Sequence, residues 1–460
     1  MKISESPQFS VEDVINQSGF GRYQYRMLFV CGLAWSTMAI QVCLMTFLKP
    51  EIVTEWDLSD AAIGTVEALF FTGMLLGAFL WGCISDRYGR RVGYLGAVSV
   101  AGIFGLCTTF SQSIEVFAFL RFVTGIGIGG ESIPFTLLAE FSPKYSRAKL
   151  LLVNLIFWPI GILFGIGIAW TILPSLGWRW FLIFSAIPIC LNIFLLLIIP
   201  ESPRFLLLKC KFEKAEKILH NIVEENRGQY PKGTLIREKE IQNGSIQDLL
   251  RIEFRRTTLI LWFIWFSVTF GYFGIIFITP RFFDHSDIYL VTFITTISEI
   301  PGFLLPLVFV DRIGRKNGML LFFVMFGCFC LSLIDVFQIP TYKIGSIICI
   351  FGARLFIAGC FGIVYLYTTE VYPTLIRATG LGTTLVWSRL GGALATFTAH
   401  TIRSSVVMIL FATLAFSSAF CCHLLEIETR GMDLKDELTQ DDDVQRSSQA
   451  SIEMKRFQQL

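Results

Sequence analysis

The chain has 460 residues, of which 54% are hydrophobic and 16% charged, and its formal net charge is +2. This balance is too apolar and too poor in charge for a soluble domain of that length. It predicts an integral membrane protein with lipid as its main solvent.

The first 26 residues are polar and of mixed charge, so residues 1–26 are predicted to be a cytosolic segment and not a signal peptide. After them, apolar stretches recur that are long enough to cross a hydrocarbon core of about 30 Å as helices. The twelve predicted transmembrane helices are 27–48, 61–83, 93–111, 115–137, 150–172, 179–199, 258–280, 288–310, 318–337, 343–366, 378–399 and 405–426.

These spans divide into an N-terminal six-helix half at 27–203 and a C-terminal six-helix half at 258–426. The segment 204–257 between them is polar and is predicted to be a cytosolic central loop with a helix at 212–225. Residues 427–460 are polar and include an acidic run, which predicts a disordered cytosolic tail. The fold class expected is therefore an all-α membrane protein.

Lys and Arg are concentrated in the loops after spans two, four, eight and ten. Basic loops stay on the cytosolic side of a membrane, so these loops and both termini are predicted to be cytosolic. The sequence does not distinguish a vesicle membrane from the plasma membrane.

Two motifs occur once in each half. Asp86-Arg-Tyr-Gly-Arg-Arg91 recurs in the second half as Asp311-Arg-Ile-Gly-Arg-Lys316, and the stretch from Glu140 to Arg147 recurs at nearly the same separation as Glu370 to Arg377. Parallel six-helix repeats are the building plan of one large class of secondary transporters.

The loop from Gly82 to Arg91 resembles the signature loop of the major facilitator superfamily. Arg121-Phe-Val-Thr-Gly-Ile-Gly-Ile-Gly-Gly130 and Pro200-Glu-Ser-Pro-Arg204 resemble the subset of sugar porters and organic cation and anion transporters. Phe9-Ser-Val-Glu-Asp13 and Thr369-Glu-Val-Tyr-Pro373 look like the synaptic vesicle 2-related group, over almost the whole chain. The resemblance implies the major facilitator fold and alternating access.

One departure from this group concerns the first span. The related proteins carry acidic residues there, whereas this chain has Met38 and Gln41. A proton-carrying carboxylate is therefore expected to be absent from span one.

The resemblance also implies cytosolic gating contacts, with Asp86 as a latch toward Arg90 and toward the N-terminal end of a neighbouring helix. The alternative is that these charges only set the orientation of the loops. The predicted gating residues are Asp86, Arg87, Arg90, Arg121, Glu140, Arg147, Glu201, Arg204, Asp311, Arg315, Glu370 and Arg377.

Ionisable groups within spans cost about 2.5–3.5 kcal/mol each and are candidates for function. Four were identified: Glu67, Glu131, Glu299 and Arg389. Arg389 matches a cavity arginine of the organic ion transporters and is expected to pair with an organic anion or, alternatively, to be structural. Glu299 either exchanges protons or pairs with Arg389, and for Glu67 a helix interface is favoured over the cavity.

Four amphipathic side chains lie at depths suited to a site at the middle of the membrane. Together with three of the ionisable groups they form the predicted substrate-binding set, which is Gln41, Glu131, Trp158, Tyr272, Glu299, Tyr365 and Arg389.

These features predict a secondary transporter of a small organic solute, with an organic ion as the favoured class and coupling to an ion or proton gradient left open. The alternatives are a receptor or vesicle interaction protein that has lost transport, and a sugar-type porter. The four histidines are scattered and no phosphate-binding loop is present. We therefore expect no enzyme activity, no cofactor or metal, no nucleic-acid partner, and a monomer.

Overall fold

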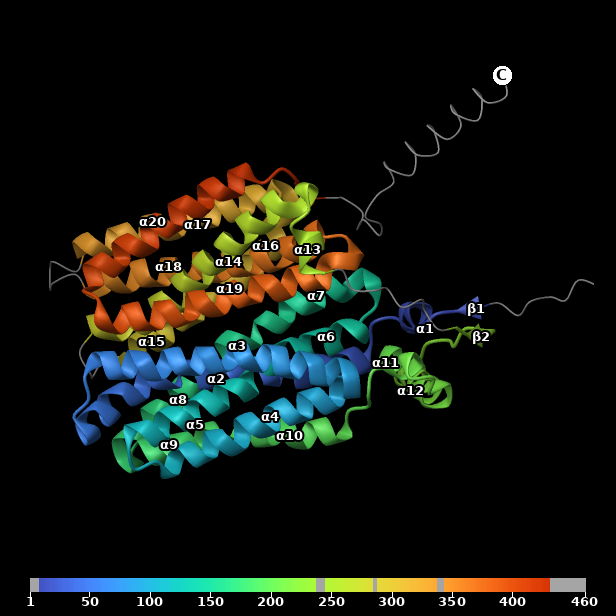
Figure 1. Ribbon diagram of the computed structural model, residues 1–460, viewed down its shortest axis with the longest axis horizontal. Coiled ribbons are helices and arrows are strands. Elements are labelled where there is room, and N and C mark those ends of the chain that lie inside the picture. The colour runs from blue at the N-terminus through green and yellow to red at the C-terminus, as the bar shows by residue number, and fades with distance from the viewer. Residues whose placement is uncertain (1–7, 237–244, 284–287, 337–342, 431–460) are drawn as a thin grey trace, which may run out of the picture.

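The computed structural model describes residues 8–236, 245–283, 288–336 and 343–430, and almost all of the secondary structure is helical. Within these residues, twelve long helical segments form two six-helix halves that lie side by side (Figure 1), the N-terminal half coloured blue to green and the C-terminal half yellow-green to red. This is the predicted all-α architecture.

The segments of the N-terminal half are α2 (Arg22–Trp56), α3 (Asp60–Tyr88), α4 (Arg90–Cys107) with η1 (Thr108–Phe110), α5 (Ile114–Ile128) with η2 (Gly129–Glu131) and α6 (Ser132–Glu140), α7 (Lys144–Leu155) with α8 (Phe157–Leu176), and α9 (Trp178–Ser185) with α10 (Ile187–Ile198). Those of the C-terminal half are α14 (Ile252–Ile278) with η3 (Thr279–Phe282), α15 (Ile288–Ile297) with α16 (Glu299–Ile313), α17 (Arg315–Val336), α18 (Lys343–Val371), α19 (Thr374–Thr401) and α20 (Ser404–Leu424).

Each predicted span coincides with one of these segments, and most of the helices extend several residues beyond the prediction. Eleven segments of the described chain are long and apolar enough to cross a membrane. The remaining one, α19, is more polar because it contains Arg377, Arg389 and His400. It packs against α14 and against α3 of the other half, so the protein shields its polar face from lipid.

The close packing of α3 against α5 depends on glycine. A methyl group added at Gly125 would lie 2.2 Å from the carbonyl oxygen of Phe70, and one added at Gly129 would lie 2.4 Å from that of Met74. Gly73 of α3 is equally close to the backbone of α5. These glycines therefore allow the backbones of α3 and α5 to approach each other closely.

Two carboxylates lie where a helix is interrupted. Glu131 ends the short turn η2 between α5 and α6, and Glu299 begins α16 directly after the break at Ser298. Pro301 follows and has no N–H to donate to the residue four positions earlier, which accounts for the break at Ser298. The tail from residue 431 onward lies outside the described residues.

The short elements gather at one end of the bundle (Figure 1), which we call the linker end; the other is the far end. They are β1 (Gln8–Phe9), α1 (Val11–Ser18), α11 (Pro203–Leu208), α12 (Phe212–Glu225), β2 (Thr234–Leu235) and α13 (Ile246–Leu249). The predicted helix 212–225 is confirmed as α12. The short parallel pairing of β1 with β2 and the helix α1, which Ser10 and Asp13 cap reciprocally, were not predicted.

Candidate substrate cavity

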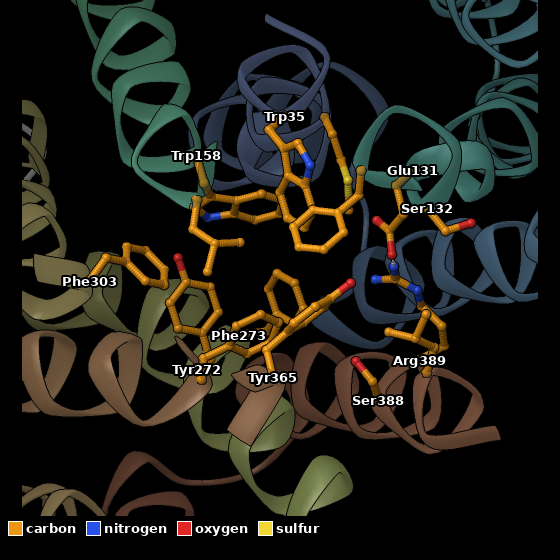
Figure 2. A pocket seen from close by; sticks show the side chains of 15 residues that line it. Trp35, Glu131, Ser132, Trp158, Tyr272, Phe273, Phe303, Tyr365, Ser388 and Arg389 are labelled. Atoms are coloured by element: carbon orange, nitrogen blue, oxygen red, sulfur yellow. Dashed lines mark ion pairs between the residues drawn. The ribbon is translucent and has the colours of Figure 1, made fainter. Parts of the chain in front are cut away.

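A cavity lies between the two halves (Figure 2). The N-terminal half contributes side chains from α2, η2, α6, α7 and α8, and the C-terminal half from α14, α16, α18 and α19. The residues that line it are Trp35, Met38, Glu131, Ser132, Phe135, Leu155, Trp158, Tyr272, Phe273, Phe303, Phe361, Tyr365, Leu385, Ser388 and Arg389.

Aromatic rings form most of the wall and meet across the boundary between the halves. The ring of Phe135 lies 4.7 Å from that of Tyr365, and Trp158 lies 6.3 Å from Tyr272, measured between centroids. Figure 2 shows the tryptophans on one side of the space and the tyrosines on the other. A ligand in the cavity therefore touches aromatic faces from both halves.

The two indole groups keep unused hydrogen-bond donors. Trp35 and Trp158 are 8% and 5% exposed, and neither Nε1 atom has a hydrogen-bond partner among the described residues. Buried indole N–H groups usually find an acceptor. These donors are therefore available to an acceptor group on a ligand.

One ion pair joins the halves at the edge of the cavity. The guanidinium of Arg389 on α19 pairs with Oε1 of Glu131 on η2, and Oε2 of Glu131 has no hydrogen-bond partner among the described residues. The dashed line in Figure 2 marks this pair. In this structure Arg389 thus pairs with a carboxylate of the protein itself.

Glu299 lies behind the cavity wall. Its Oε1 accepts a hydrogen bond of 2.9 Å from Nε of Arg354 on α18, and its Oε2 accepts one of 2.7 Å from the hydroxyl of Tyr272. Glu299 and Arg354 are completely buried. The predicted alternative in which Glu299 pairs with Arg389 is therefore wrong, and only Tyr272 of this group reaches the cavity.

Gln41 and Arg121 also lie in the interior, outside the cavity lining. Arg121 on α5 donates to Oε1 and to the backbone oxygen of Gln41 at 3.1 and 2.8 Å, and its guanidinium lies 4.1 Å above the ring of Phe70. The contact ties α5 to α2 within one half. Arg121 was predicted as a gating residue. Its contact with Gln41 of α2 lies in the interior of one half and not at the signature loops.

The predicted set of ionisable groups within spans was incomplete, because Arg121, Arg354 and His400 are also buried there. Arg354 is hidden in the long apolar stretch of α18. The repeat would have revealed it, since Arg121 and Arg354 are separated along the chain by nearly the same distance as the two copies of each motif.

A second set of charged contacts lies at the far end, and we call it the far-end cluster: Lys49, Asp60, Glu67, Arg281 and His400. Oε2 of Glu67 lies 3.1 Å from Nε2 of His400, so α3 and α19 are linked between the halves. Lys49 lies 2.6 Å from Asp60, and Arg281 lies 3.6 Å from it. Glu67 thus lies at a helix interface, as the sequence favoured.

The signature loops at the linker end form two equivalent networks. Arg90 pairs with Asp86 and, at 3.4 Å, with Glu140. In the other half Arg315 pairs with Asp311 and with Glu370, both at 3.0 Å. Each of these pairs joins residues of one half.

The N-terminal end of α4 is bound by Glu201. Glu201 accepts from the backbone N–H of Arg91 at 3.1 Å, and Glu428 accepts from that of Arg315 at 2.8 Å at the start of α17. Gly89 adopts a φ of +118°, and a methyl group added there would collide with the Glu201 carboxylate. The motif glycine therefore makes room for this contact.

The remaining predicted gating residues have separate partners. Arg147 and Arg204 both reach Glu12 of α1, at 3.3 and 3.1 Å. Arg377 donates to the backbone oxygen of Tyr372, and Arg87 is exposed. Their roles in gating stay predictions. The described ion pairs that cross between the halves lie at the cavity and at the far end, so those contacts hold the halves together there.

The family described as "Sugar (and other) transporter" matches residues 13–438. The chain belongs to this family. It is thus a transporter of the major facilitator superfamily, as its signature loops predicted. The synaptic vesicle 2-related protein of Bos taurus is 37% identical, with 93% of this chain and 82% of that protein aligned.

The chain is also similar to a plant transporter in sequence and to a bacterial transporter in structure. The organic cation/carnitine transporter 7 of Arabidopsis thaliana is 30% identical over 94% of this chain and 97% of its own length. The xylose transporter XylE from E. coli, in a partially occluded inward open conformation, is 20% identical and superposes with a TM-score of 0.74 over 90% of this chain and 100% of its own. That likeness supports the fold alone.

Proposed function

We propose that the protein transports a small organic ion by alternating access, in which the two halves rock about the central cavity. The observation that carries the proposal is the cavity itself, an aromatic wall interrupted by one ion pair, Glu131–Arg389, whose two partners come from different halves.

An organic ion fits this wall better than a sugar does. Aromatic faces attract cations and pack against apolar rings, while Arg389 and Glu131 offer one charge of each sign. A sugar would need a dense set of hydrogen-bonding side chains, and most of the lining residues are apolar or aromatic. The similarity to an organic cation/carnitine transporter agrees with this class of substrate.

A charged ligand would also explain how binding moves the halves. A ligand carboxylate that takes Arg389, or a ligand cation that takes Glu131, replaces an ion pair that links α19 to η2. The halves then lose a direct connection and are joined through the ligand. Since far-end contacts also hold the halves together, we infer that the cavity of this conformation communicates with the linker end. We infer from the positive charge of its loops that this end faces the cytosol.

The test is a thermal-shift screen of the purified protein with organic anions, organic cations and sugars. A ligand at a hundred times its Kd stabilises the native state by about 2.7 kcal/mol. We expect an ionic compound to raise the Tm. Its effect should be lost in Arg389→Gln if it is an anion and in Glu131→Gln if it is a cation.

The double variant Glu131→Gln/Arg389→Gln is the matched control, because it removes both charges and leaves neither buried alone. Stabilisation by sugars that survives in this double variant would contradict the organic-ion proposal and support the sugar-type porter. A compound that stabilises the protein but is not moved into proteoliposomes would support the receptor alternative.

A further inference from the structure

A second pocket lies inside the N-terminal half, beside the substrate cavity, and we call it the side pocket. It lies between α2, α4, α10 and the break at η2 that separates α5 from α6. Trp35, Met38 and Glu131 line both spaces, so the side pocket adjoins the cavity. A ligand in the side pocket would therefore lie close to the ion pair between Glu131 and Arg389.

Three side-chain oxygens of residues that line the side pocket have no hydrogen-bond partner among the described residues. They are Oγ1 of Thr37, Oε2 of Glu131 and Oδ1 of Asn192. Thr37 and Asn192 are 4% and 0% exposed, and the side chain of Glu131 is 10% exposed. Buried polar groups nearly always have a partner. Three such oxygens on the wall of one pocket therefore predict a ligand there.

The contacts of the same side chains leave these oxygens free. Nδ2 of Asn192 donates to the backbone oxygen of Val30 at 3.0 Å. A carbonyl oxygen only accepts, so this bond fixes the orientation of the amide and leaves Oδ1 free. Arg389 engages Oε1 of Glu131 and leaves the other carboxylate oxygen free (Figure 2). All three groups can thus present oxygen lone pairs to a ligand.

This set of oxygens has the chemistry of a sodium site. Carboxylate, amide and hydroxyl oxygens are ligands of hard cations. Only one of the three is charged, which matches a monovalent ion better than Ca²⁺, whose sites combine several carboxylates. Gly127 and Ile128, at the C-terminal end of α5, also line the pocket. Such an end carries partial negative charge, and the ends of interrupted helices coordinate Na⁺ in other transporters.

The charge of Glu131 links this ion to a ligand in the substrate cavity. While Arg389 pairs with Glu131 the pair is neutral, and a cation in the side pocket would add an unbalanced charge to the interior. A ligand anion that takes Arg389 leaves Glu131 unbalanced, and a sodium ion at its Oε2 restores neutrality. Each ion therefore strengthens the binding of the other, by the same factor.

We propose that Thr37, Glu131 and Asn192 bind a sodium ion in the side pocket, and that this ion binds together with an organic anion at Arg389. The proposal rests on the organic-ion transport proposed above and narrows it to cotransport of an organic anion with Na⁺. Because Glu131 and Arg389 belong to different halves, the two bound ions together replace an ion pair that joins them.

The first experiment needs no substrate. Thermal unfolding of the purified full chain in lipid nanodiscs is followed while sodium chloride replaces potassium chloride at constant ionic strength. In Arg389→Gln the carboxylate of Glu131 has no counter-charge, so we expect Na⁺ to raise the Tm of this variant in a saturable manner and to raise that of the wild type much less. The response should be absent from Glu131→Gln/Arg389→Gln, in which neither charge remains.

Further variants test the two neutral oxygens. Thr37→Val and Asn192→Leu, each combined with Arg389→Gln, should raise the Na⁺ concentration at half of the full effect by about tenfold or more. Thr124→Val in the same background is the matched control. Thr124 lies in the same half, and its hydroxyl already donates to the backbone oxygen of Leu120 at 2.8 Å. This control should respond to Na⁺ as Arg389→Gln alone does.

The second experiment uses the wild type and an organic anion that raises its Tm in the screen described above. We expect the Kd of this anion to be about tenfold lower in Na⁺ than in K⁺. Thr37→Val should remove most of that difference and leave the Kd in K⁺ unchanged, because Thr37 does not line the substrate cavity.

The sodium site is overturned if Arg389→Gln responds equally to both salts or stays unfolded in both. It is also overturned if the Thr37 and Asn192 variants keep the full response, which would indicate an adventitious ion only. Anion binding and flux that do not depend on Na⁺ would leave the transport proposal standing without the sodium site. Stabilisation of Arg389→Gln by Na⁺, in a protein that moves no solute, would leave the site standing while the transport proposal fails.

Discussion

The buried ion pair Glu299–Arg354 stabilises the protein only while both charges are present. Both side chains are completely buried, and Thr295 and Tyr272 complete their hydrogen bonds. Removal of one partner from such a pair costs about 3–5 kcal/mol, because the other charge stays buried alone.

We therefore expect Glu299→Gln to lower the free energy of unfolding by about that amount and to lower the Tm accordingly. The double variant Glu299→Gln/Arg354→Gln should recover much of the loss, since no charge is then left unpaired. Arg87→Gln, at an exposed site, should change the stability by less than about 0.5 kcal/mol. If Glu299→Gln were as stable as the wild type, Glu299 and Arg354 would not form a buried ion pair in the folded protein.

Arg121 is buried, and its side-chain partner is the uncharged amide of Gln41. We therefore expect Gln41→Glu to stabilise the protein. The new carboxylate would lie where Gln41 Oε1 now accepts from Arg121 at 3.1 Å, and hydrogen bonds to charged groups stabilise by about 1.5–3 kcal/mol. We expect a higher Tm than the wild type at neutral pH. The gain should shrink as the pH falls and the carboxylate takes up a proton, and Gln41→Leu, which cannot accept, should lower the Tm at every pH.

At the scale of helices, the carboxylates of Glu201 and Glu428 each bind the first free N–H groups of a helix, α4 and α17. An acceptor in this position stabilises a helix end by about 0.5–2 kcal/mol. Glu201→Gln should therefore speed hydrogen exchange at the start of α4 only, and Glu428→Gln at the start of α17 only. Glu213→Gln, in the exposed first turn of α12, is the control. Exchange that rises equally in both helices would instead indicate a general loss of stability.

The helices could be predicted from the sequence, whereas most of their side-chain partners could not. Apolar runs and basic loops define a span without reference to its neighbours, and the contact of Asp86 with Arg90 could be expected because the two residues are close in sequence. The pairing of Arg389 with Glu131 depends on how α19 is rotated against η2. The contact of Glu67 with His400 depends on how the two halves pack against each other. Neither is encoded in spacing along one helix.

For the whole molecule, alternating access requires the far ends of α3 and α19 to separate. Gly64 of α3 is a close contact point, since a Cβ there would lie 3.5 Å from Cα of Phe397. A disulfide between cysteines at positions 64 and 397 should therefore form under oxidation and keep the far end closed. Closing a long loop in this way stabilises a native state by about 2–4 kcal/mol.

We expect the oxidised double variant Gly64→Cys/Phe397→Cys to have a raised Tm and to lose the flux of whichever compound the thermal-shift screen identifies, with both properties restored by a reductant. Each single variant, oxidised in the same way, controls for the native cysteines and should keep its flux. Because the cross-link leaves the cavity residues intact, ligand binding from the linker end should survive. Flux that continues through the cross-linked protein would show that transport does not require the two halves to part at this end.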